Sequence, residues 1–325
     1  MIFLNIAILI VGFAALVKGA DIFVDGSANL ARRFRVPSLV IGLTIVALGT
    51  SMPELAVSTS AALAGANEIA LSNVVGSNIF NLLGVLGICA VISPVPVEKA
   101  VLRRDFPLNI ATTLLVLLVV AFSKIIGGSL FSLGMEEKAG VVSRPLAIVL
   151  LVLFVAYIVY LIFDAKKNPV SEEESALPPL FKSVLFIVVG LLLIIVGGKA
   201  VVYAAREIAR AAGMSETLIG LTIVAIGTSL PELVTSIVAA RKGETALAVG
   251  NVIGSNIFNL LFILGVSAAI RPVSVNAASV YDLAILVFVT ALSFVFSLSG
   301  KRILRAEGLC MLAMYVASTA FAVLR

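Results

Sequence analysis

Two glutamates, Glu54 and Glu232, are the residues of this chain whose positions most need a chemical explanation. Each lies well inside an apolar stretch, whereas nearly all of the chain's 18 acidic residues lie in loops or near the ends of such stretches. If these stretches span a bilayer, a charged side chain near its centre costs at least about 2.5–3.5 kcal/mol. Because that cost has to be offset, a carboxylate at this depth indicates a binding function.

A proline precedes each glutamate and is expected to change the backbone as well. Pro53 and Pro231 have no N–H group, so the carbonyl groups of Gly49 and Gly227 lose their helical partners and the helix bends or unwinds. Freed carbonyl groups are tolerated at membrane depth only where they are buried in protein or line a cavity. In such places they can bind cations.

Hydroxyl and carboxamide groups accompany the two carboxylates. Two hydroxyl side chains lie within one helical turn before each glutamate, and a serine and an asparagine spaced i, i+4 share one helix face in the next apolar stretch. These residues are Thr50, Ser51, Ser77 and Asn81 in the first half of the chain and Thr228, Ser229, Ser255 and Asn259 in the second. Together they form an all-oxygen ligand set.

An all-oxygen set is typical of hard cations. Ca²⁺ takes about 6–8 oxygen ligands, whereas the thiols and imidazoles that softer metals prefer are missing from this ligand set. The chain has no histidine, and its two cysteines, Cys89 and Cys310, lie in apolar runs. Two carboxylates carry a charge of −2, which one Ca²⁺, two Na⁺ or two protons would neutralise. Competition for this charge is a physical basis for ion exchange.

The composition indicates where these residues lie. Of the 325 residues, 61% are hydrophobic and 13% are charged, and the mean hydropathy is +1.19. Soluble proteins average about 45–50% apolar and about 25% charged residues. So few charges cannot cover a water-soluble particle, which predicts a polytopic membrane protein. The absence of histidine also excludes Ser-His-Asp catalysis and histidine zinc sites.

Ten apolar stretches are long enough for a helix to cross a bilayer, which takes about 20 residues. The first has no basic residues at its start and is interpreted as a retained helix, not a signal peptide. The stretches lie near residues 2–30, 37–63, 69–92, 106–123, 145–163, 181–208, 216–240, 246–270, 280–298 and 303–324.

The basic residues predict the orientation. With ten spans both termini lie on one side; 14 of the Lys and Arg residues fall on the opposite side and 7 on the side of the termini. The positive-inside rule therefore places both termini outside and the linker 164–180 in the cytoplasm. We expect the chain to lie in the cell (inner) membrane. The net charge of +5 is explained in this way, without nucleic-acid binding.

The chain contains an internal repeat. Residues 42–83 align with 220–261 at a constant offset of 178, and 27 of the 42 positions are identical. Each half contains five spans, an odd number, so the second half enters the membrane in the opposite orientation. We therefore predict an all-α membrane protein of ten transmembrane helices, built as two inverted five-helix repeats over 1–163 and 181–325. A structural ion pair with Lys18 or Lys199 is the alternative role for the glutamates, but neither lysine has a basic counterpart in the other half.

At these motifs the sequence resembles the sodium/calcium exchanger branch of the calcium:cation antiporter superfamily. GTSMPE at 49–54 and GTSLPE at 227–232 resemble the cores of the family's two α-repeats, and GSNIFN at 76–81 and 254–259 completes them. The resemblance covers the whole ten-span layout. It implies a secondary antiporter, not an enzyme, that exchanges Ca²⁺ for Na⁺ by alternating access, with no organic cofactor or obligate protein partner.

The resemblance also implies ligand roles. Glu54 and Glu232 would hold Ca²⁺, and the carbonyl groups of Ala47 and Ala225, with the hydroxyl residues named above, would shape the Ca²⁺ and Na⁺ positions. Many members have Asp at the position of Asn259, so the Asn here weakens the case for K⁺ co-transport.

Three other functions are weighed against this one. A proton-coupled antiporter would use the same fold, since buried carboxylates protonate readily. A passive cation channel would use the same ligands, but channels are commonly rings of subunits. An intramembrane enzyme is disfavoured, because the acids inside the spans form a symmetric ligand pattern.

Overall fold

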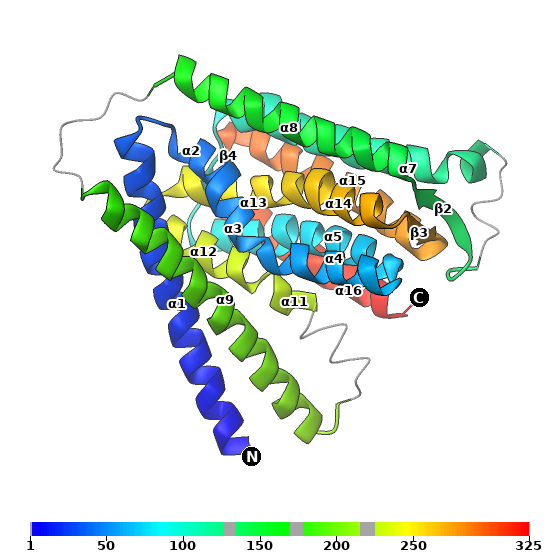
Figure 1. Cartoon of the computed structure of the whole chain (residues 1–325), viewed down its shortest axis with the longest axis horizontal. Coiled ribbons are helices and arrows are strands. Elements are labelled where there is room, and N and C mark those ends of the chain that lie inside the picture. Colours follow the sequence, from blue (N-terminus) through cyan, green and yellow to red (C-terminus); the bar gives the residue numbers. More distant parts are fainter. Residues whose placement is uncertain (1, 127–133, 170–177, 215–224, 325) are drawn as a thin grey trace. The chain divides into compact units, whose positions relative to one another are not determined.

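The computed structural model describes residues 2–126, 134–169, 178–214 and 225–324 (Figure 1). Its regular structure is almost entirely helical, as expected of apolar segments whose backbone groups must find hydrogen bonds without water. The chain forms two compact units, which are described separately. The first unit comprises residues 1–53 and 161–254, and the second comprises residues 54–160 and 255–325.

The first unit is helical throughout its described part. Its helices are α1 (Ile2–Arg33), α2 (Ser38–Ile41), the π-helix η1 (Gly42–Val46), α3 (Ala47–Thr50), α9 (Leu180–Ala211), α11 (Ala225–Thr228) and α12 (Leu230–Arg241). Three helices run through the boundaries between the units, namely α4 (Met52–Ala64), α8 (Arg144–Lys167) and α13 (Thr245–Ile257).

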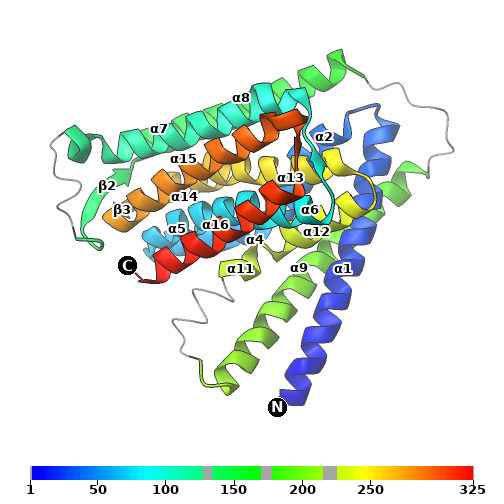
Figure 2. The same ribbon diagram turned by 180° about the vertical axis from the view of Figure 1, so that it is seen from behind.

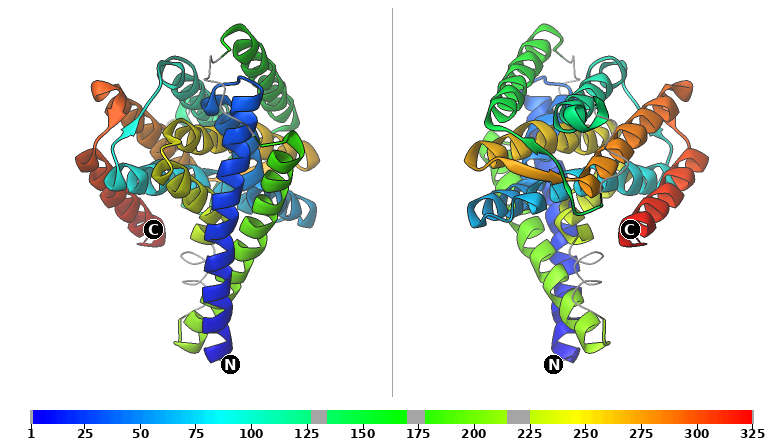
Figure 3. Two further views of the ribbon diagram at one scale, coloured as in Figure 1. Left: turned by 90° about the vertical axis from the view of Figure 1, so that its left-hand side faces the viewer. Right: turned by 90° about the vertical axis from the view of Figure 1, so that its right-hand side faces the viewer.

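The two longest helices, α1 and α9, lie side by side in the first unit (Figures 1 and 3). Glycines spaced seven residues apart face each other across the contact. A Cβ atom on Gly19 would lie 2.8 Å from the carbonyl oxygen of Gly190, and one on Gly197 would lie 2.7 Å from the backbone nitrogen of Leu16. The two backbones therefore touch, an arrangement that small residues permit between membrane helices.

The second unit combines helices with two short antiparallel strand pairs. Its helices are α5 (Asn67–Ile79), the π-helix η2 (Phe80–Val85), α6 (Leu86–Ile92), the π-helix η3 (Val101–Asp105), α7 (Phe106–Ile126), the π-helix η6 (Phe258–Ile263), α14 (Leu264–Ile270), α15 (Ala277–Leu298), the 3₁₀-helix η7 (Ser299–Lys301) and α16 (Arg305–Leu324). Its strands are β1 (Val95–Pro96), β2 (Lys138–Val142), β3 (Val273–Asn276) and β4 (Arg302–Ile303), paired β1 with β4 and β2 with β3.

Aromatic contacts hold the helices of the second unit together. The rings of Phe106 on α7 and Phe294 on α15 are 5.6 Å apart, and those of Phe80 and Tyr315 on α16 are 5.2 Å apart. Figure 2 shows α7 beside α15 and α6 beside α16, and the right-hand view of Figure 3 shows the β2–β3 ribbon. Strand β2 brings Val142 opposite Val273, which ties the segment before α8 to the segment before α15.

The described helices agree with the predicted spans. Eight of them are long and apolar enough to cross a membrane, and α2–α3 with α4 form one further span that is bent by 49°. These correspond to nine of the ten predicted stretches, which makes the chain a multi-pass membrane protein. The seventh stretch, 216–240, begins outside the described residues and continues as α11 and α12, so the count of ten stays a prediction.

The predicted division into halves also stays a prediction. Each compact unit takes helices from both halves, because the units follow spatial contacts and the halves follow sequence similarity. The predicted linker 164–180 begins later than expected, because α8 continues to Lys167; α9 begins at Leu180. Residues 170–177 of this linker lie outside the described part.

Adjacent glycines of α9 provide a test of the backbone contact with α1. A Cβ atom on Gly197 would lie 2.7 Å from the nitrogen of Leu16, whereas one on Gly198 would meet nothing closer than 3.8 Å. We expect Gly197→Ala to lower the free energy of unfolding by about 1–3 kcal/mol, the usual effect of overpacking. Thermal unfolding of the purified protein in detergent measures this, with Gly198→Ala as the matched control. Equal effects of the two substitutions would contradict the packing described.

Candidate ion-binding site

The helix is broken just before each glutamate, as the prolines predict. Helix α3 ends at Thr50 and α11 ends at Thr228, and a new helix begins after one further residue in each case. That residue adopts nearly the same conformation in both motifs, with φ −85° and ψ 9° at Ser51 and φ −96° and ψ 10° at Ser229. These angles belong to the sparsely populated bridge region, in which active-site residues are often found.

Each glutamate consequently lies in the first turn of a new helix. Glu54 belongs to the first turn of α4 and Glu232 to that of α12, and both side chains are fully buried. The N-terminal end of a helix carries a partial positive charge, which stabilises a nearby carboxylate. The break thus places a buried negative charge where the backbone offsets part of its cost.

In the first unit, hydroxyl groups surround Glu232. The hydroxyl group of Ser51 donates a hydrogen bond of 2.8 Å to Oε1 of Glu232. The neighbouring Thr50 hydroxyl lies 3.0 Å from Oδ1 of Asn251, which is itself held to the Glu232 backbone. Ser51 of one motif is therefore in contact with the glutamate of the other motif, and Thr50 contacts the asparagine that braces that glutamate.

In the second unit, Glu54 has a similar neighbour from the next helix. The hydroxyl group of Ser77 on α5 lies 3.4 Å from Oε1 of Glu54. Ser77 is almost completely buried, so the contact is shielded from solvent. This pair joins the first motif to the GSNIFN string that follows it.

Two further asparagines brace the glutamates and were not selected from the sequence. Nδ2 of Asn73 lies 2.9 Å from the Ser58 hydroxyl and 3.3 Å from the Glu54 carbonyl oxygen. Asn251 makes the same two contacts in the other motif, 2.9 Å to Ser236 and 3.4 Å to the Glu232 carbonyl oxygen. The repeat is thus present in the contacts as well as in the residue types.

Four buried asparagines form a reciprocal network in the second unit. Nδ2 of Asn78 donates to the carbonyl oxygen of Asn256 at 3.1 Å, and Nδ2 of Asn256 donates to that of Asn78 at 3.2 Å. Nδ2 of Asn81 then donates to Oδ1 of Asn256, and Nδ2 of Asn259 donates to Oδ1 of Asn78. Each member bonds to a residue of the other repeat.

The network leaves two oxygens available. Oδ1 of Asn81 and Oδ1 of Asn259 are buried and have no hydrogen-bond partner among the described residues. Both asparagines are the second residue of a π-helix, η2 or η6, and such turns often occur at functional sites. A buried acceptor without a partner requires an explanation, and a bound cation would supply one.

The remaining predicted residues have mixed positions. The carbonyl oxygen of Ala47 already accepts from the Ser51 nitrogen at 3.0 Å, and the Thr50 hydroxyl lies 3.4 Å away. The buried hydroxyl group of Ser255 has no hydrogen-bond partner in the described part of the chain. Ser229 is buried at the helix break, Thr228 is half-buried at the end of α11, and Ala225 begins that helix.

The glycines that open the two GSNIFN strings have different surroundings. A Cβ atom on Gly254 would lie 2.7 Å from Cα of Leu43, so a neighbouring backbone does come close there. No described atom lies within 4 Å of such an atom on Gly76. Leu221, the repeat counterpart of Leu43, lies outside the described residues.

Two further charged residues have partners in the structure. Lys18, considered as a partner for a glutamate, bonds instead to Asp21 at 2.7 Å. Asp105, which the predicted span 106–123 left outside, is fully buried and bonds to Arg104 at 2.6 Å and to the Tyr157 hydroxyl at 2.9 Å. It is a third buried acid, but it has a cationic neighbour in the sequence. Among the described residues, no three His, Cys, Asp or Glu side chains group together as a metal site.

Comparison with known proteins agrees with this arrangement. A family model described as sodium/calcium exchanger protein matches residues 4–163 and 182–324. The putative antiporter CaxA of Alkalimonas amylolytica is 38% identical over 94% of this chain and 95% of its own length. The sodium/calcium exchanger MaX1 of Methanosarcina acetivorans is 33% identical over 98% of both chains.

A solved structure shares the fold. The sodium-calcium exchanger NCX_Mj, soaked with Na⁺ and Ca²⁺, superposes with a TM-score of 0.82 at 32% sequence identity, covering 98% of this chain and 99% of that one. The family match spans nearly the whole chain, and the repeated motifs, broken helices and buried carboxylates lie within it. This chain therefore belongs to the sodium/calcium exchanger family of membrane cation antiporters.

Proposed function

We propose that this protein exchanges Ca²⁺ for Na⁺ across the cell membrane by alternating access. The observation that carries the proposal is that Glu54 and Glu232 occupy equivalent positions of the repeat and are both fully buried in the first turn of a helix after a break. A buried carboxylate is costly unless a positive charge compensates it. A transported cation is a compensating charge that enters and leaves.

The proposed ligands are oxygens of the two motifs. The carboxylates of Glu54 and Glu232 hold Ca²⁺, and the carboxamide oxygens of Asn81 and Asn259 complete a set of hard donors. The hydroxyl groups of Thr50, Ser51, Ser77 and their counterparts Thr228, Ser229 and Ser255, with the carbonyl groups of Ala47 and Ala225, bind Ca²⁺ or the Na⁺ ions that replace it. The unpartnered Oδ1 atoms of Asn81 and Asn259 support this assignment.

Coupling follows from charge. Two carboxylates need two positive charges, supplied by one Ca²⁺ or by two Na⁺, and an uncompensated charge of −2 opposes passage through the apolar core. Exchange is therefore favoured over leakage of a single ion. Sodium is preferred to protons as the counter-ion because relatives such as MaX1 are named for sodium. In the proposed orientation both termini lie outside and the linker 164–180 is cytoplasmic.

Counter-ion identity can be tested by reconstitution. In proteoliposomes loaded with Na⁺ we expect uptake of ⁴⁵Ca²⁺ that depends on the internal Na⁺, because both ions compete for the same carboxylates. Vesicles with an imposed pH gradient and vesicles without any gradient are the comparisons. Uptake driven by the pH gradient and indifferent to Na⁺ would refute sodium coupling, and uptake without any gradient would indicate a channel.

The glutamates are tested by removing their charge while keeping their shape. Glu54→Gln and Glu232→Gln should each abolish exchange and weaken Ca²⁺ binding about tenfold to 100-fold, since a charge-assisted contact is worth about 1.5–3 kcal/mol. Glu68→Gln, at an exposed position on α5, is the matched control. Calcium-dependent thermal stabilisation reports binding separately from transport. Wild-type exchange in either glutamine variant would refute the ligand role.

Asn259 is tested by adding a charge. Nδ2 of Asn259 donates to Oδ1 of Asn78 at 3.0 Å, and a carboxylate cannot donate. We expect Asn259→Asp to lower the free energy of unfolding in ion-free buffer by about 1–3 kcal/mol, and added cations should restore part of this loss. Asn276→Asp is the control, because Asn276 only accepts a hydrogen bond, from the Ser279 nitrogen. If thermal unfolding finds both variants equally stable, the donor role of Asn259 is wrong.

A further inference from the structure

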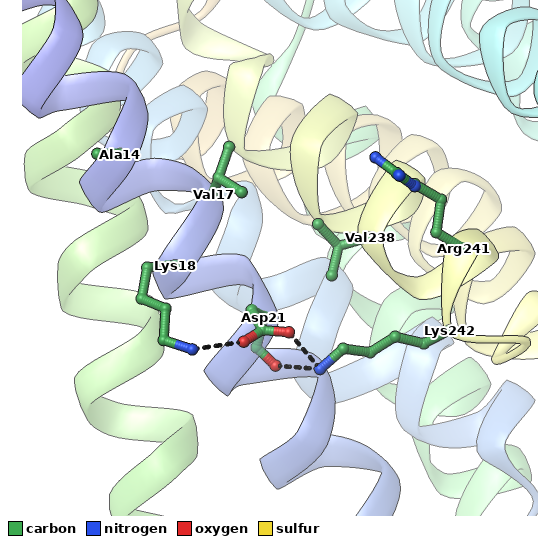
Figure 4. Close-up of a pocket in the computed structure, with 7 residues that line it drawn as sticks. All are labelled: Ala14, Val17, Lys18, Asp21, Val238, Arg241 and Lys242. Atoms are coloured by element: carbon green, nitrogen blue, oxygen red, sulfur yellow. Dashed lines mark hydrogen bonds and ion pairs between the residues drawn. The ribbon is translucent and has the colours of Figure 1, made fainter.

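The first unit carries a charged cluster whose residues belong to neither motif. It consists of Lys18, Asp21 and Asp25 on α1 and of Arg241 and Lys242 at the end of α12. The Lys242 ammonium group lies 2.5 Å from an oxygen of Asp21 and 2.6 Å from one of Asp25, and Lys18 lies 2.7 Å from the other Asp21 oxygen. Figure 4 shows the two lysines reaching Asp21 from opposite sides.

A cavity of about 360 Å³ lies beside this cluster. Lys18, Asp21, Arg241 and Lys242 line one part of it, and the apolar side chains of Ala14, Val17 and Val238 line the rest (Figure 4). Its wall is therefore divided between charged and apolar groups. A ligand that fills it needs a polar and an apolar part.

The cluster has an excess of positive charge. It contains three cations and two carboxylates, and both carboxylates are already bonded to lysines. Arg241 is exposed, and its guanidinium group has no ion-pair or hydrogen-bond partner among the described residues. Burial lowers the pKa of Lys242, but hydrogen bonds to Asp21 and Asp25 outweigh burial and raise that pKa above its usual value, so Lys242 remains charged. One positive charge is left to bind an anion.

The cavity lies at the end of an apolar segment. Residues 2–17 of α1 contain no charged side chain, and at about 1.5 Å per residue they span about 24 Å, most of the roughly 30 Å hydrocarbon core. Lys18 is the first charged residue of the helix, and Val17 before it is 49% exposed. If residues 2–17 cross the hydrocarbon core, the charged end of the cavity lies at the level of lipid headgroups and its apolar end faces acyl chains, so the membrane segment ends before the predicted boundary at residue 30.

We propose that this cavity binds an anionic phospholipid, with the phosphodiester group on Arg241 and the lysines and an acyl chain along Ala14, Val17 and Val238. A phosphodiester carries one negative charge, which matches the excess of the cluster. Guanidinium groups bind phosphate oxygens in a bidentate way, and lysines extend along apolar surfaces towards headgroups. By the positive-inside distribution, the lipid belongs to the cytoplasmic leaflet. The proposal requires a membrane location and does not depend on which ions the protein exchanges.

Native mass spectrometry of the purified full-length protein tests the proposal. The probes are phosphatidylglycerol, phosphatidylethanolamine and phosphatidylcholine with identical acyl chains, offered at equal concentration. We expect preferential retention of phosphatidylglycerol and about a fivefold loss of its affinity in Arg241→Gln, because a basic residue near an anionic headgroup is worth about 1 kcal/mol. Arg241→Lys keeps the charge and should retain most of the binding.

The matched control is Arg103→Gln, which removes another exposed arginine on the side predicted to be cytoplasmic. If Arg241→Gln and Arg103→Gln bind phosphatidylglycerol equally, the site is wrong. Equal retention of phosphatidylglycerol and phosphatidylcholine by the wild type would also overturn it. Displacement of the lipid by glycerol 3-phosphate at similar concentration would show a site for soluble phosphates instead. If Arg241→Gln does not fold, the same comparison is made with Arg241→Lys and Arg241→Met.

Discussion

The structure depends on the cost of keeping carboxylates in an apolar, water-poor environment. Glu54 and Glu232 are fully buried, and each lies at the start of a helix and accepts a hydrogen bond from a serine outside that helix. These contacts reduce the cost without supplying a full compensating charge. Asp105 shows the other solution, because Arg104 and Tyr157 bind it directly. Asp105 is thus held as part of the scaffold of the second unit.

The helix breaks and the asparagines also lower the cost of burying the glutamates. Prolines end the regular helix at Ser51 and Ser229, which creates the helix starts that the glutamates occupy. Asn73 donates a hydrogen bond to the backbone carbonyl group of Glu54, and Asn251 donates one to that of Glu232. Each glutamate is therefore held through its backbone as well as through its side chain. In the apolar stretches these amides supply the hydrogen bonds that water supplies in a soluble protein, since every polar group there needs a partner from within the chain.

The sequence predicted most of the helices, because long apolar runs and proline breaks are local signals. It also indicated that serines and threonines accompany the glutamates, since these residues lie in the same short motifs. It did not predict the roles of Asn78 and Asn256, because the partner of each is 178 positions away and no local pattern tells an ion-facing amide from one that bonds to the other repeat. Asp105 was missed for a related reason: the π-helix over Val101–Asp105 extends the span beyond the apolar run. The compact units could not be predicted, since spatial contacts join helices from both halves of the chain.

The reciprocal bond between Asn78 and Asn256 has a consequence for how the two halves can diverge. Most positions of a duplicated segment are free to change in one copy while the other compensates elsewhere. Here the acceptor of each bond is a backbone carbonyl group, which any residue retains, so substitution of one asparagine removes one of the two bonds and leaves the other. A change in one copy therefore leaves a buried carbonyl group of the other copy without its donor. The cost of divergence at either asparagine thus falls on the opposite half of the chain.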